Sequence, residues 1–533
     1  MLEFFYTDKF DEDVVLKNNS KTISKKELKH YVYKNISILQ KKKENVVIVQ
    51  KDILSFVINF FASIFTGKNI YLVDDVRKIS DLDVDFDILC DCELEYSTEI
   101  TRLEDVDSSK VLINLMTSGS SGKSKCVIKS LLNLITEAKD IYSTFDFSNE
   151  QLIISSSTSC AHLFGLTFGF MFPLCNGFAI NLDVVEYPDK FELENSFFVS
   201  TPSFLDTVKK NGILLKNAKY IVSAGAKLKD DTFEYLEQTS NVIEIYGSTE
   251  TGVIAYRRHF EDKALTLFEN VKISLLEDTI ALKTPYAYQD EVIINDRAEF
   301  VGDKIVLKER TDRLLKIQEK RISAESLEKE LSQNEFVKEA YCFKYQEKVA
   351  CLCALSDLGK DFLLKYGLNE LSKRLKIYLK DTHEIVPQKW KFIDEIFRTK
   401  SGKIDRRIIE RMFNMNVSFP IILDRKLEEN SVVLKLYLYK SCNFFSGHFP
   451  EFPITPGVVQ LYLASFYGEY FFNKNLVGGQ IRKIKFSNII NAGDVVDLKL
   501  TFNERNVSFE YFDNEKTFSS GMFSCENVFA GVV

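Results

Sequence analysis

The sequence lacks several features that would narrow its function at once. It contains no internal repeat and no low-complexity tract, and with 45% hydrophobic and 27% charged residues it has the composition of an ordinary soluble globular protein. It has no surplus of positive charge, because 77 acidic side chains outnumber 69 basic ones and the formal net charge is −8. Such a chain does not attract phosphate backbones in general. We therefore expect small molecules and proteins as partners, and no nucleic acid.

Two other common signals are also missing. The close cysteine pairs, Cys90/Cys92 and Cys351/Cys353, have the spacing C-x-C rather than the C-x-x-C of zinc and redox sites, which predicts reduced thiols. No basic segment precedes an apolar one at the N-terminus, so no signal peptide is expected and a cytoplasmic location follows.

One apolar run could be taken for a membrane span. Residues 161–180 contain no Asp, Glu, Lys or Arg. They do contain His162, Pro173, Asn176 and three glycines, which favour a buried helix followed by a turn. We therefore predict no membrane span.

The length of 533 residues corresponds to about three to four domains of roughly 150 residues each. In the first half, short β-branched runs alternate with helical patterns, as at 46–49, 52–65 and 70–73, which predicts βαβ units and a mostly parallel sheet. Further strands are predicted at 111–115, 152–155, 197–200, 220–222 and 242–246. Ligands bind such sheets at the carboxyl ends of the strands, where the loops lie.

The pattern changes twice along the chain. A charge-dense run at 308–313 is followed by mixed helix and strand to about residue 412. After Pro420 the sequence becomes strand-rich, with one apolar helix predicted from about 458 to 472. We therefore predict a large lobe at 1–309, a smaller lobe at 310–412 and a third domain at 418–533.

A loop rich in Ser and Gly follows the strand predicted at 111–115. Residues 117–125 read Thr-Ser-Gly-Ser-Ser-Gly-Lys-Ser-Lys, and their small side chains leave backbone amides free to surround phosphate oxygens. A Walker loop would need glycine at the position of Thr117, so the P-loop ATPase interpretation fails on spacing. Taken alone, this loop could also be an ordinary surface turn.

Three later segments accompany this loop. They are His-Leu-Phe-Gly at 162–165, Ser-Ala-Gly-Ala-Lys-Leu at 223–228 and Tyr-Gly-Ser-Thr-Glu-Thr-Gly at 246–252. With them the chain resembles the adenylate-forming superfamily of acyl-CoA synthetases, peptide-synthetase adenylation domains and luciferases. In the phosphate loop, Ser124 stands where that family has proline and Cys126 where it has a last glycine.

The resemblance implies roles for individual residues. It implies that ATP is held by Thr117, Ser118, Gly119, Ser120, Ser121, Gly122, Lys125, Gly225, Ala226, Tyr246, Gly247, Thr249, Asp296 and Arg310. Within this set Thr249 would contact phosphate and Asp296 would bind the ribose hydroxyls. Glu250 would hold Mg²⁺, a hard cation that prefers carboxylate oxygen, and His162 would line the acyl pocket.

The resemblance extends into the smaller lobe. Residues 398–404, Arg-Thr-Lys-Ser-Gly-Lys-Ile, match the family's C-terminal lysine loop, with Phe397 where proline is usual. Lys403 would be the catalytic lysine, a cation that offsets charge as the acyl-adenylate forms and pyrophosphate leaves. Asp312 would be the hinge of a mobile lobe.

The third domain carries a motif of its own. Residues 447–458 read Gly-His-Phe-Pro-Glu-Phe-Pro-Ile-Thr-Pro-Gly-Val, which resembles the hotdog-fold β-hydroxyacyl-carrier-protein dehydratases. The resemblance implies that His448 removes the α-proton of a 3-hydroxyacyl thioester and that the amide of Gly457 polarises the thioester carbonyl. Tyr462 stands where the family has its acidic residue, and a phenol is a weaker acid than a carboxyl group.

The sequence therefore predicts an α/β adenylate-forming fold, with a large lobe and a small mobile α+β lobe, followed by an α+β hotdog domain. The expected function is ATP- and Mg²⁺-dependent activation of a carboxylic acid, with CoA or the phosphopantetheine of an acyl-carrier protein as acceptor, joined to a dehydratase. A homodimer through residues 418–533 is the expected assembly. The alternative is a scaffold that recruits acyl-carrier protein through an inactive hotdog.

Overall fold

The computed structural model describes residues 1–7, 11–50, 52–73, 79, 82–90, 92–94, 103, 105–118, 124–148, 150–185, 195–276, 279–308, 313–317, 320–399, 402–415, 417–428, 430–449, 451–474, 476, 480–503 and 505–525. The chain forms two compact units. Unit 1 comprises Met1–Lys308 together with Thr399–Lys403, and unit 2 comprises Glu309–Arg398 and Ile404–Val533.

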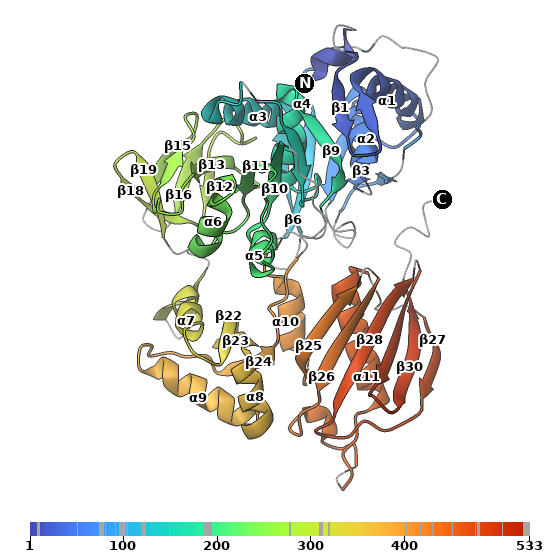
Figure 1. Cartoon of the computed structure of the whole chain (residues 1–533), viewed down its shortest axis with the longest axis vertical. Coiled ribbons are helices and arrows are strands. Elements are labelled where there is room, and N and C mark those ends of the chain that lie inside the picture. Colours follow the sequence, from blue (N-terminus) through green and yellow to red (C-terminus); the bar gives the residue numbers. More distant parts are fainter. Residues whose placement is uncertain are drawn as a thin grey trace. The chain divides into compact units, whose positions relative to one another are not determined.

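Unit 1 is built on a large mixed sheet and a smaller, mostly parallel one (Figure 1). The large sheet has the order β18-β19-β14-β13-β12-β11-β10-β8-β9-β1-β2, and its run from β12 to β1 is parallel. The smaller sheet has the order β5-β3-β4-β6-β7, parallel up to β6. A three-stranded sheet, β15-β16-β17, completes the unit. These sheets confirm the predicted mostly parallel arrangement of the first half.

The strands of unit 1 are β1 (Val14–Lys17), β2 (Thr22–Ser24), β3 (Asn45–Val49), β4 (Asn69–Val73), β5 (Phe86–Leu89), β6 (Leu112–Ser118), β7 (Ser124–Ser130), β8 (Ile153–Ser156), β9 (Ala179–Val184), β10 (Ser196–Ser200), β11 (Ala218–Ser223), β12 (Asn241–Ser248), β13 (Gly252–Arg257), β14 (Leu265–Leu267), β15 (Lys272–Leu275), β16 (Ile280–Lys283), β17 (Val292–Ile294), β18 (Arg297–Val301) and β19 (Lys304–Lys308). Its helices are η1 (Leu2–Phe5), α1 (Lys25–Leu39), α2 (Ile53–Phe65), α3 (Leu131–Phe145), η3 (Gly165–Met171), α4 (Phe172–Asn176), α5 (Pro202–Lys210) and α6 (Asp230–Glu237).

Helices cover both faces of the large sheet because its strands alternate between two apolar cores. In β10, Phe197 and Val199 face a core shared with α2, α3 and η3, whereas Phe198 faces one formed with α5 and α6. In β11, Val222 faces the first of these cores and Ile221 faces the second. A sheet buried on both faces needs apolar residues at successive positions, which is the pattern of these strands.

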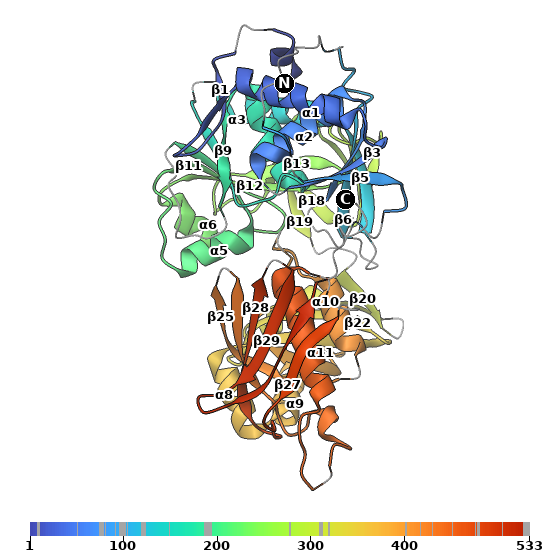
Figure 2. The same cartoon turned by 90° about the vertical axis from the view of Figure 1, so that its right-hand side faces the viewer.

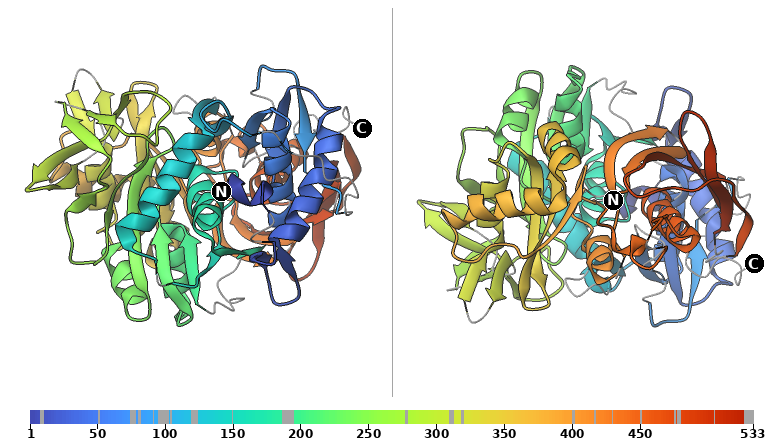
Figure 3. Two further views of the ribbon diagram at one scale, coloured as in Figure 1. Left: turned by 90° about the horizontal axis from the view of Figure 1, so that it is seen from above. Right: turned by 90° about the horizontal axis from the view of Figure 1, so that it is seen from below.

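The apolar run at 161–180 forms part of this core. Its helical segments η3 and α4 are buried and lie beside α3 (Figure 3, left). Among the described residues, no helix is long and apolar enough to cross a membrane. The prediction of a buried helix is therefore confirmed.

Unit 2 begins with the small strands and helices of residues 314–414. These are β20 (Leu314–Ile317), β21 (Lys320–Ser323), α7 (Ala324–Leu331), β22 (Val337–Tyr345), β23 (Lys348–Leu355), α8 (Asp357–Tyr366), α9 (Leu368–Lys380), β24 (Lys389–Ile393) and α10 (Arg406–Asn414). Strands β22, β23 and β24 form one sheet, on which α7 packs against β22 and α8 against β23.

The rest of unit 2 is a six-stranded sheet around one long helix (Figure 2). Its elements are β25 (Ile421–Glu428), β26 (Ser431–Tyr437), η5 (Asn443–Phe445), α11 (Gly457–Phe472), β27 (Ile481–Phe486), β28 (Val495–Asn503), β29 (Asn506–Phe512) and β30 (Thr517–Ser524). The sheet has the order β25-β26-β28-β29-β30-β27, is antiparallel throughout and curls around α11 (Figure 3, right). This arrangement is the predicted hotdog.

The two parts of unit 2 share their apolar cores. One core joins Phe343, Ile409 and Met412 to Phe419, Phe466 and other residues of the hotdog. A second core joins apolar residues of β23 and α9 to Ile421 of β25. The predicted division into separate domains at 310–412 and 418–533 stays a prediction, because the contacts place both parts in one compact unit.

None of the ten cysteines is joined in a disulfide bond. Burial raises the pKa of the Cys160 thiol to about 12, so at neutral pH this group is protonated. That the cysteines are reduced thiols stays a prediction.

Candidate functional site

The phosphate-loop segment connects two paired antiparallel strands in unit 1. Strands β6 and β7 pair Thr117 with Lys125, and the Thr117 hydroxyl donates to the Lys125 carbonyl oxygen at 3.2 Å. Of the predicted phosphate-binding residues, Gly119, Ser120, Ser121 and Gly122 lie outside the described part of the chain, as does the side chain of Ser118. The two ends of the loop are thus fixed by strand pairing.

Glu250 lies in the turn between β12 and β13 and is paired with this hairpin. The Lys125 Nζ is 2.9 Å from the Glu250 Oε1. Burial by itself raises the pKa of the Glu250 carboxyl group, but the hydrogen bond and positive charge of Lys125 outweigh it, so the net pKa lies below its ordinary value. Glu250 is therefore a carboxylate at neutral pH, beside the loop expected to hold phosphate.

Two buried side chains, those of Lys129 and Glu137, support the turn that contains Glu250. The Lys129 Nζ donates to the Glu250 carbonyl oxygen at 3.1 Å and to the Tyr286 carbonyl oxygen at 2.6 Å, and burial lowers the pKa of Lys129 to about 8. Glu137 accepts from the Val253 amide at 2.7 Å. Both side chains are at most 1% exposed. Burial raises the pKa of the Glu137 carboxyl group, although the positive charge of Lys129 opposes this rise.

Two glycines in the same turn are required by close contacts. A side chain on Gly247 would come within 2.3 Å of the Gly252 carbonyl oxygen. Gly252 has φ of +79°, and a side chain there would come within 2.5 Å of Glu137 Oε1. The two glycines of the Tyr-Gly-Ser-Thr-Glu-Thr-Gly sequence thus follow from the tight path of the chain, and this path places Thr249 and Glu250 in a half-buried turn.

Tyr246, at the end of β12, is joined to Asp296. The Tyr246 hydroxyl donates to the Asp296 Oδ2 at 2.7 Å, and Asp296 is 7% exposed in the connection between β17 and β18. The structure therefore brings together two residues that the sequence predicted to bind nucleotide.

The lysine hairpin tip lies beside the loop after β11. A side chain on Gly225 would come within 4.0 Å of the Lys403 Cε, and a side chain on Gly402 would come within 2.2 Å of the Ser203 Oγ. Gly225 has φ of +93° and Ala226 is exposed beside it. Lys403 is itself exposed, so its amine can reach a ligand held on this loop.

His162 lies at the start of the buried segment that continues into η3. Its backbone amide donates to the Ser159 carbonyl oxygen at 3.1 Å, and its carbonyl oxygen accepts from the Leu166 amide at 2.8 Å. Nearby, Gln50 Oε1 accepts from the Ser159 hydroxyl at 2.9 Å and the Cys160 amide at 2.6 Å. The His162 side chain is half-buried, and its role in the acyl pocket stays a prediction.

In unit 2, the hotdog motif places Gly457 as the first residue of α11, preceded by Pro456. A side chain on Gly457 would come within 2.7 Å of the Phe486 ring, so a larger residue there would require this ring to move. His448 is exposed, and the following residue Phe449 has φ of +62°. The unpaired amides at the start of a helix favour a developing negative charge.

Tyr462 lies one and a half turns into α11, near Arg411. Burial raises the pKa of the Tyr462 hydroxyl, and the positive charge of Arg411 opposes this rise. Glu469 is 5% exposed, forms an ion pair with Arg411 and accepts from the Leu476 amide at 3.0 Å. The nearest acid on the helix is thus engaged in structural contacts.

Comparison with known proteins decides what these two sites belong to. The chain matches the AMP-binding enzyme family over residues 67–279 and the ApeI-like dehydratase family over residues 424–522. The chain carries an AMP-binding domain and an ApeI-like dehydratase domain. The dehydratase domain is 33% identical over 93 residues to the 3-hydroxyacyl-[acyl-carrier-protein] dehydratase FabZ of Clostridium novyi (strain NT), a match that spans 15% of this chain and 66% of that protein.

Solved structures share the fold of the AMP-binding part. ATP-bound MatB from Rhodopseudomonas palustris is 15% identical, with a TM-score of 0.64 over 77% of this chain and 98% of that one. A benzoate CoA ligase from Burkholderia xenovorans LB400 is 16% identical, with a TM-score of 0.59 over 76% and 97%. The O-succinylbenzoate coenzyme A synthetase MenE from Bacillus subtilis, in complex with AMP, is 14% identical, with a TM-score of 0.61 over 75% and 96%. The predicted adenylate-forming fold is confirmed.

Glu250 is the carboxylate of the AMP-binding domain that is predicted to hold a metal ion. Mg²⁺ is usually held by one or two carboxylates together with substrate phosphates. Among the described residues no group of three or more His, Cys, Asp or Glu side chains could hold a metal ion. Glu250, ionised and next to the phosphate hairpin, fits a cation that takes its other ligands from ATP.

Two predicted residues of the AMP-binding machinery, Arg310 and Asp312, lie outside the described residues. Lys129 and Glu137, which support the Glu250 turn, were not predicted from the sequence as site residues. No local signal distinguishes them, because Lys129 continues an alternating strand pattern and Glu137 lies within a helix. Their burial and pairing arise only when β7, α3 and β13 come together.

Proposed function

We propose that the AMP-binding domain activates a carboxylic acid, fatty or aryl, as an acyl-adenylate and transfers the acyl group to a phosphopantetheine thiol of CoA or an acyl-carrier protein. The observation that carries this proposal is the position of Lys403 beside the Gly225 loop, within the same unit as the Lys125–Glu250 pair. The proposal requires that both cations, Lys125 and Lys403, act on the phosphates of one bound ATP, because charge that develops at a transferred phosphate must be offset.

In the first step a carboxylate oxygen forms a bond to the α-phosphorus of ATP. The bond from that phosphorus to the bridging oxygen breaks, and pyrophosphate leaves with the electron pair. Lys403 offsets the negative charge that develops around the α-phosphate. Mg²⁺ held by Glu250 would neutralise phosphate oxygens. In the second step a thiolate bonds to the acyl carbon and AMP leaves, so the product is a thioester.

The test is pyrophosphate release from ATP with a panel of straight-chain and aromatic carboxylic acids. We expect release that depends on one class of acid and falls about 10²-fold to 10³-fold in Lys403→Ala, the scale of losing one preorganised charge. Lys209→Ala is the control, since it removes a half-buried lysine of α5 that is paired with Asp231 of α6. Acid-independent release, or equal rates in the two variants, would contradict the proposal.

For the dehydratase-like domain we propose elimination of water from a 3-hydroxyacyl thioester. His448 would take the α-proton, the amide at Gly457 would stabilise the enolate oxygen, and the C3 hydroxyl would leave as water with one added proton. This proposal is supported by the position of Gly457, which is the first residue of α11 and lies against the Phe486 ring. Tyr462 is the candidate acid on the helix, and its raised pKa makes it a poor one.

The second candidate function is a scaffold in which the hotdog binds an acyl carrier or another copy of itself without turnover. Tyr462 at the acid position and the engagement of Glu469 by Arg411 favour it. Enoyl formation from 3-hydroxyacyl-CoA thioesters of several chain lengths separates the two candidates. Turnover that His448→Ala removes supports the dehydratase, and its complete absence supports the scaffold.

The edge of the hotdog sheet supports a homodimer. All six residues of β27 are exposed, and Ile481, Ile484 and Phe486 are 42–50% exposed. Val458 in the first turn of α11 is 71% exposed. An exposed edge strand that carries apolar side chains between basic ones can pair with a second copy. Sedimentation of the whole chain should give a dimer, and Ile484→Lys should shift it towards the monomer.

A further inference from the structure

The lysine loop is a short hairpin whose stem belongs to unit 2. Arg398 and Ile404 form an antiparallel bridge, and the Asp405 amide donates to the Phe397 carbonyl oxygen at 2.9 Å. Nearer the tip, the Thr399 amide donates to the Lys403 carbonyl oxygen at 2.8 Å. Because these bonds connect the stem to the tip, the position of Lys403 depends on how the stem is held.

The hotdog helix α11 holds this stem. The Tyr470 hydroxyl accepts a hydrogen bond of 3.2 Å from the backbone amide of Arg398. Phe397 is fully buried, with its ring centroid 4.7 Å from that of Tyr470 and 6.0 Å from that of Phe466. Phe397 stands where the related lysine loops have proline, and here its side chain is the anchor of the hairpin in the hotdog core.

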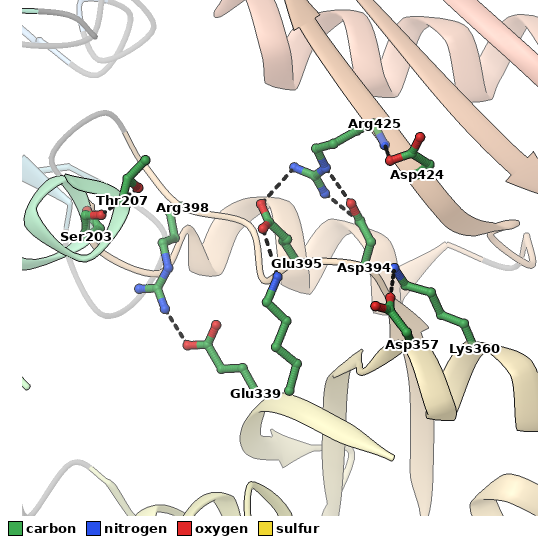
Figure 4. Close-up of polar contacts among 11 residues, drawn as sticks. Ser203, Thr207, Glu339, Asp357, Lys360, Asp394, Glu395, Arg398, Asp424 and Arg425 are labelled. Carbon is green, nitrogen blue, oxygen red and sulfur yellow. Dashed lines mark hydrogen bonds and ion pairs between the residues drawn. The ribbon is translucent and has the colours of Figure 1, made fainter. Parts of the chain in front are cut away.

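A second hotdog element holds the segment that leads into the hairpin. Arg425 of β25 makes two hydrogen bonds of 2.5 Å to the carboxylate of Asp394, which is 5% exposed, and lies 3.7 Å from Glu395 (Figure 4). Bidentate pairs of this kind fix geometry as well as adding energy. The Arg398 guanidinium turns the other way, to Glu339 of β22 (Figure 4). The backbone of the stem is therefore held by the hotdog, and the side chain of Arg398 by the small lobe.

We infer that the hotdog domain is a working part of the adenylation machinery, with Tyr470 as a positioning residue that sets the lysine hairpin and thereby Lys403. This inference rests on the proposed function of the AMP-binding domain. It assigns the hotdog a task that is independent of whether it dehydrates anything. It also explains why the lobe that carries Lys403 and the hotdog share one core.

The test compares Tyr470→Phe with Tyr345→Phe in the full-length chain. Both changes remove only a hydroxyl, and the Tyr345 hydroxyl likewise bonds to backbone in unit 2, donating to the Phe413 carbonyl oxygen at 3.0 Å. Pyrophosphate release is measured with the acid of the panel that gives the wild-type chain its highest rate. Fluorescence of Trp390, the sole tryptophan, reports the unfolding midpoint of unit 2 for each variant.

For Tyr470→Phe we expect kcat of pyrophosphate release to fall about fivefold to tenfold, the range that one hydrogen bond spans. KM for ATP should not change, and the unfolding midpoint should fall only by the small amount that one hydrogen bond contributes, about as far as in Tyr345→Phe. The second half-reaction, from acyl-adenylate and thiol, should keep its rate because no bond to pyrophosphate breaks in it. Tyr345→Phe should match the wild type in kcat and in KM for ATP. Unchanged kcat in Tyr470→Phe, or an equal loss in both variants, would overturn the inference.

A second measurement needs no substrate. Hydrogen–deuterium exchange of peptides covering residues 397–405 reports how firmly the hairpin is held. Tyr470→Phe should speed exchange there, whereas Tyr345→Phe should not, and equal protection in all three proteins would overturn the inference. If the wild-type chain releases no pyrophosphate with any acid, the proposed function fails, and this exchange measurement still decides the role of Tyr470.

Discussion

The Tyr246 hydroxyl donates a 2.7 Å hydrogen bond to the carboxylate of Asp296. This bond joins the end of β12 to the turn that precedes β18, so the nucleotide-binding candidates on the two segments have a fixed relation. Asp296 is the residue predicted to bind the ribose hydroxyls, which can donate hydrogen bonds to a carboxylate.

We expect Asp296→Asn to raise KM for ATP about tenfold to a hundredfold, because hydrogen bonds to a charged group contribute roughly 1.5–3 kcal/mol. Tyr246→Phe should raise it by less, about fivefold, because Asp296 stays in place but loses one orienting bond. Pyrophosphate release at varied ATP checks both. A larger effect from Tyr246→Phe than from Asp296→Asn would show that the phenol, not the carboxylate, binds the nucleotide.

Glu250→Gln should raise the Mg²⁺ concentration needed for half-maximal pyrophosphate release by about tenfold or more, because a neutral amide is a much weaker ligand for a hard cation. Glu237→Gln, in α6, is the matched control. The two variants are compared in a Mg²⁺ titration at fixed ATP. An unchanged Mg²⁺ requirement in Glu250→Gln would mean that the metal is bound without this side chain.

Lys391 gives the stability of unit 2 a defined pH dependence. It is half-buried on β24 beside the rings of Phe413 and Phe419, and its loss of contact with water lowers its pKa to about 8, although Cys442 opposes this shift. Between pH 8 and about 10.5 the unfolded chain binds the proton that the folded chain has lost, so the free energy of unfolding rises with pH.

Lys391→Met should therefore stabilise unit 2 at pH 7, by roughly 1–3 kcal/mol. The gain should shrink as pH rises from 8 to 10.5, because the wild-type chain then no longer buries a charge. Urea unfolding followed by Trp390 fluorescence at several pH values measures the difference between the two proteins. A constant difference across this range would show that Lys391 does not titrate there.

For the hotdog we expect slow or absent dehydration by the native chain. General acid–base groups contribute about 10²-fold to 10⁴-fold each, and burial raises the pKa of Tyr462 further from neutrality. Tyr462→Glu should increase the rate of enoyl formation, because a carboxyl group is a stronger acid than a phenol. His448→Ala in the same background should abolish the gain. Fast native turnover that Tyr462→Phe removes would instead identify the phenol as the acid.

The sequence by itself determined the elements and the motifs. The strands at 46–49, 70–73 and 197–200 and the helix at 458–472 were predictable because periodicity and β-branched runs are local properties. The loop at 117–125 and the turn at 246–252 were recognisable because close backbone approach restricts residues at fixed spacing, as the contacts of Gly247 and Gly252 show.

Only the tertiary structure decided which charges are buried and which parts share a core. Lys129 and Glu137 look like surface residues in the sequence, yet β7, α3 and β13 enclose them beneath the Glu250 turn. Phe397 looked like a departure from a motif, and its reason is the hotdog helix that follows much later in the chain, where Tyr470 and Phe466 receive it. Burial and pairing depend on the sum of long-range contacts, and no local pattern of residues encodes that sum.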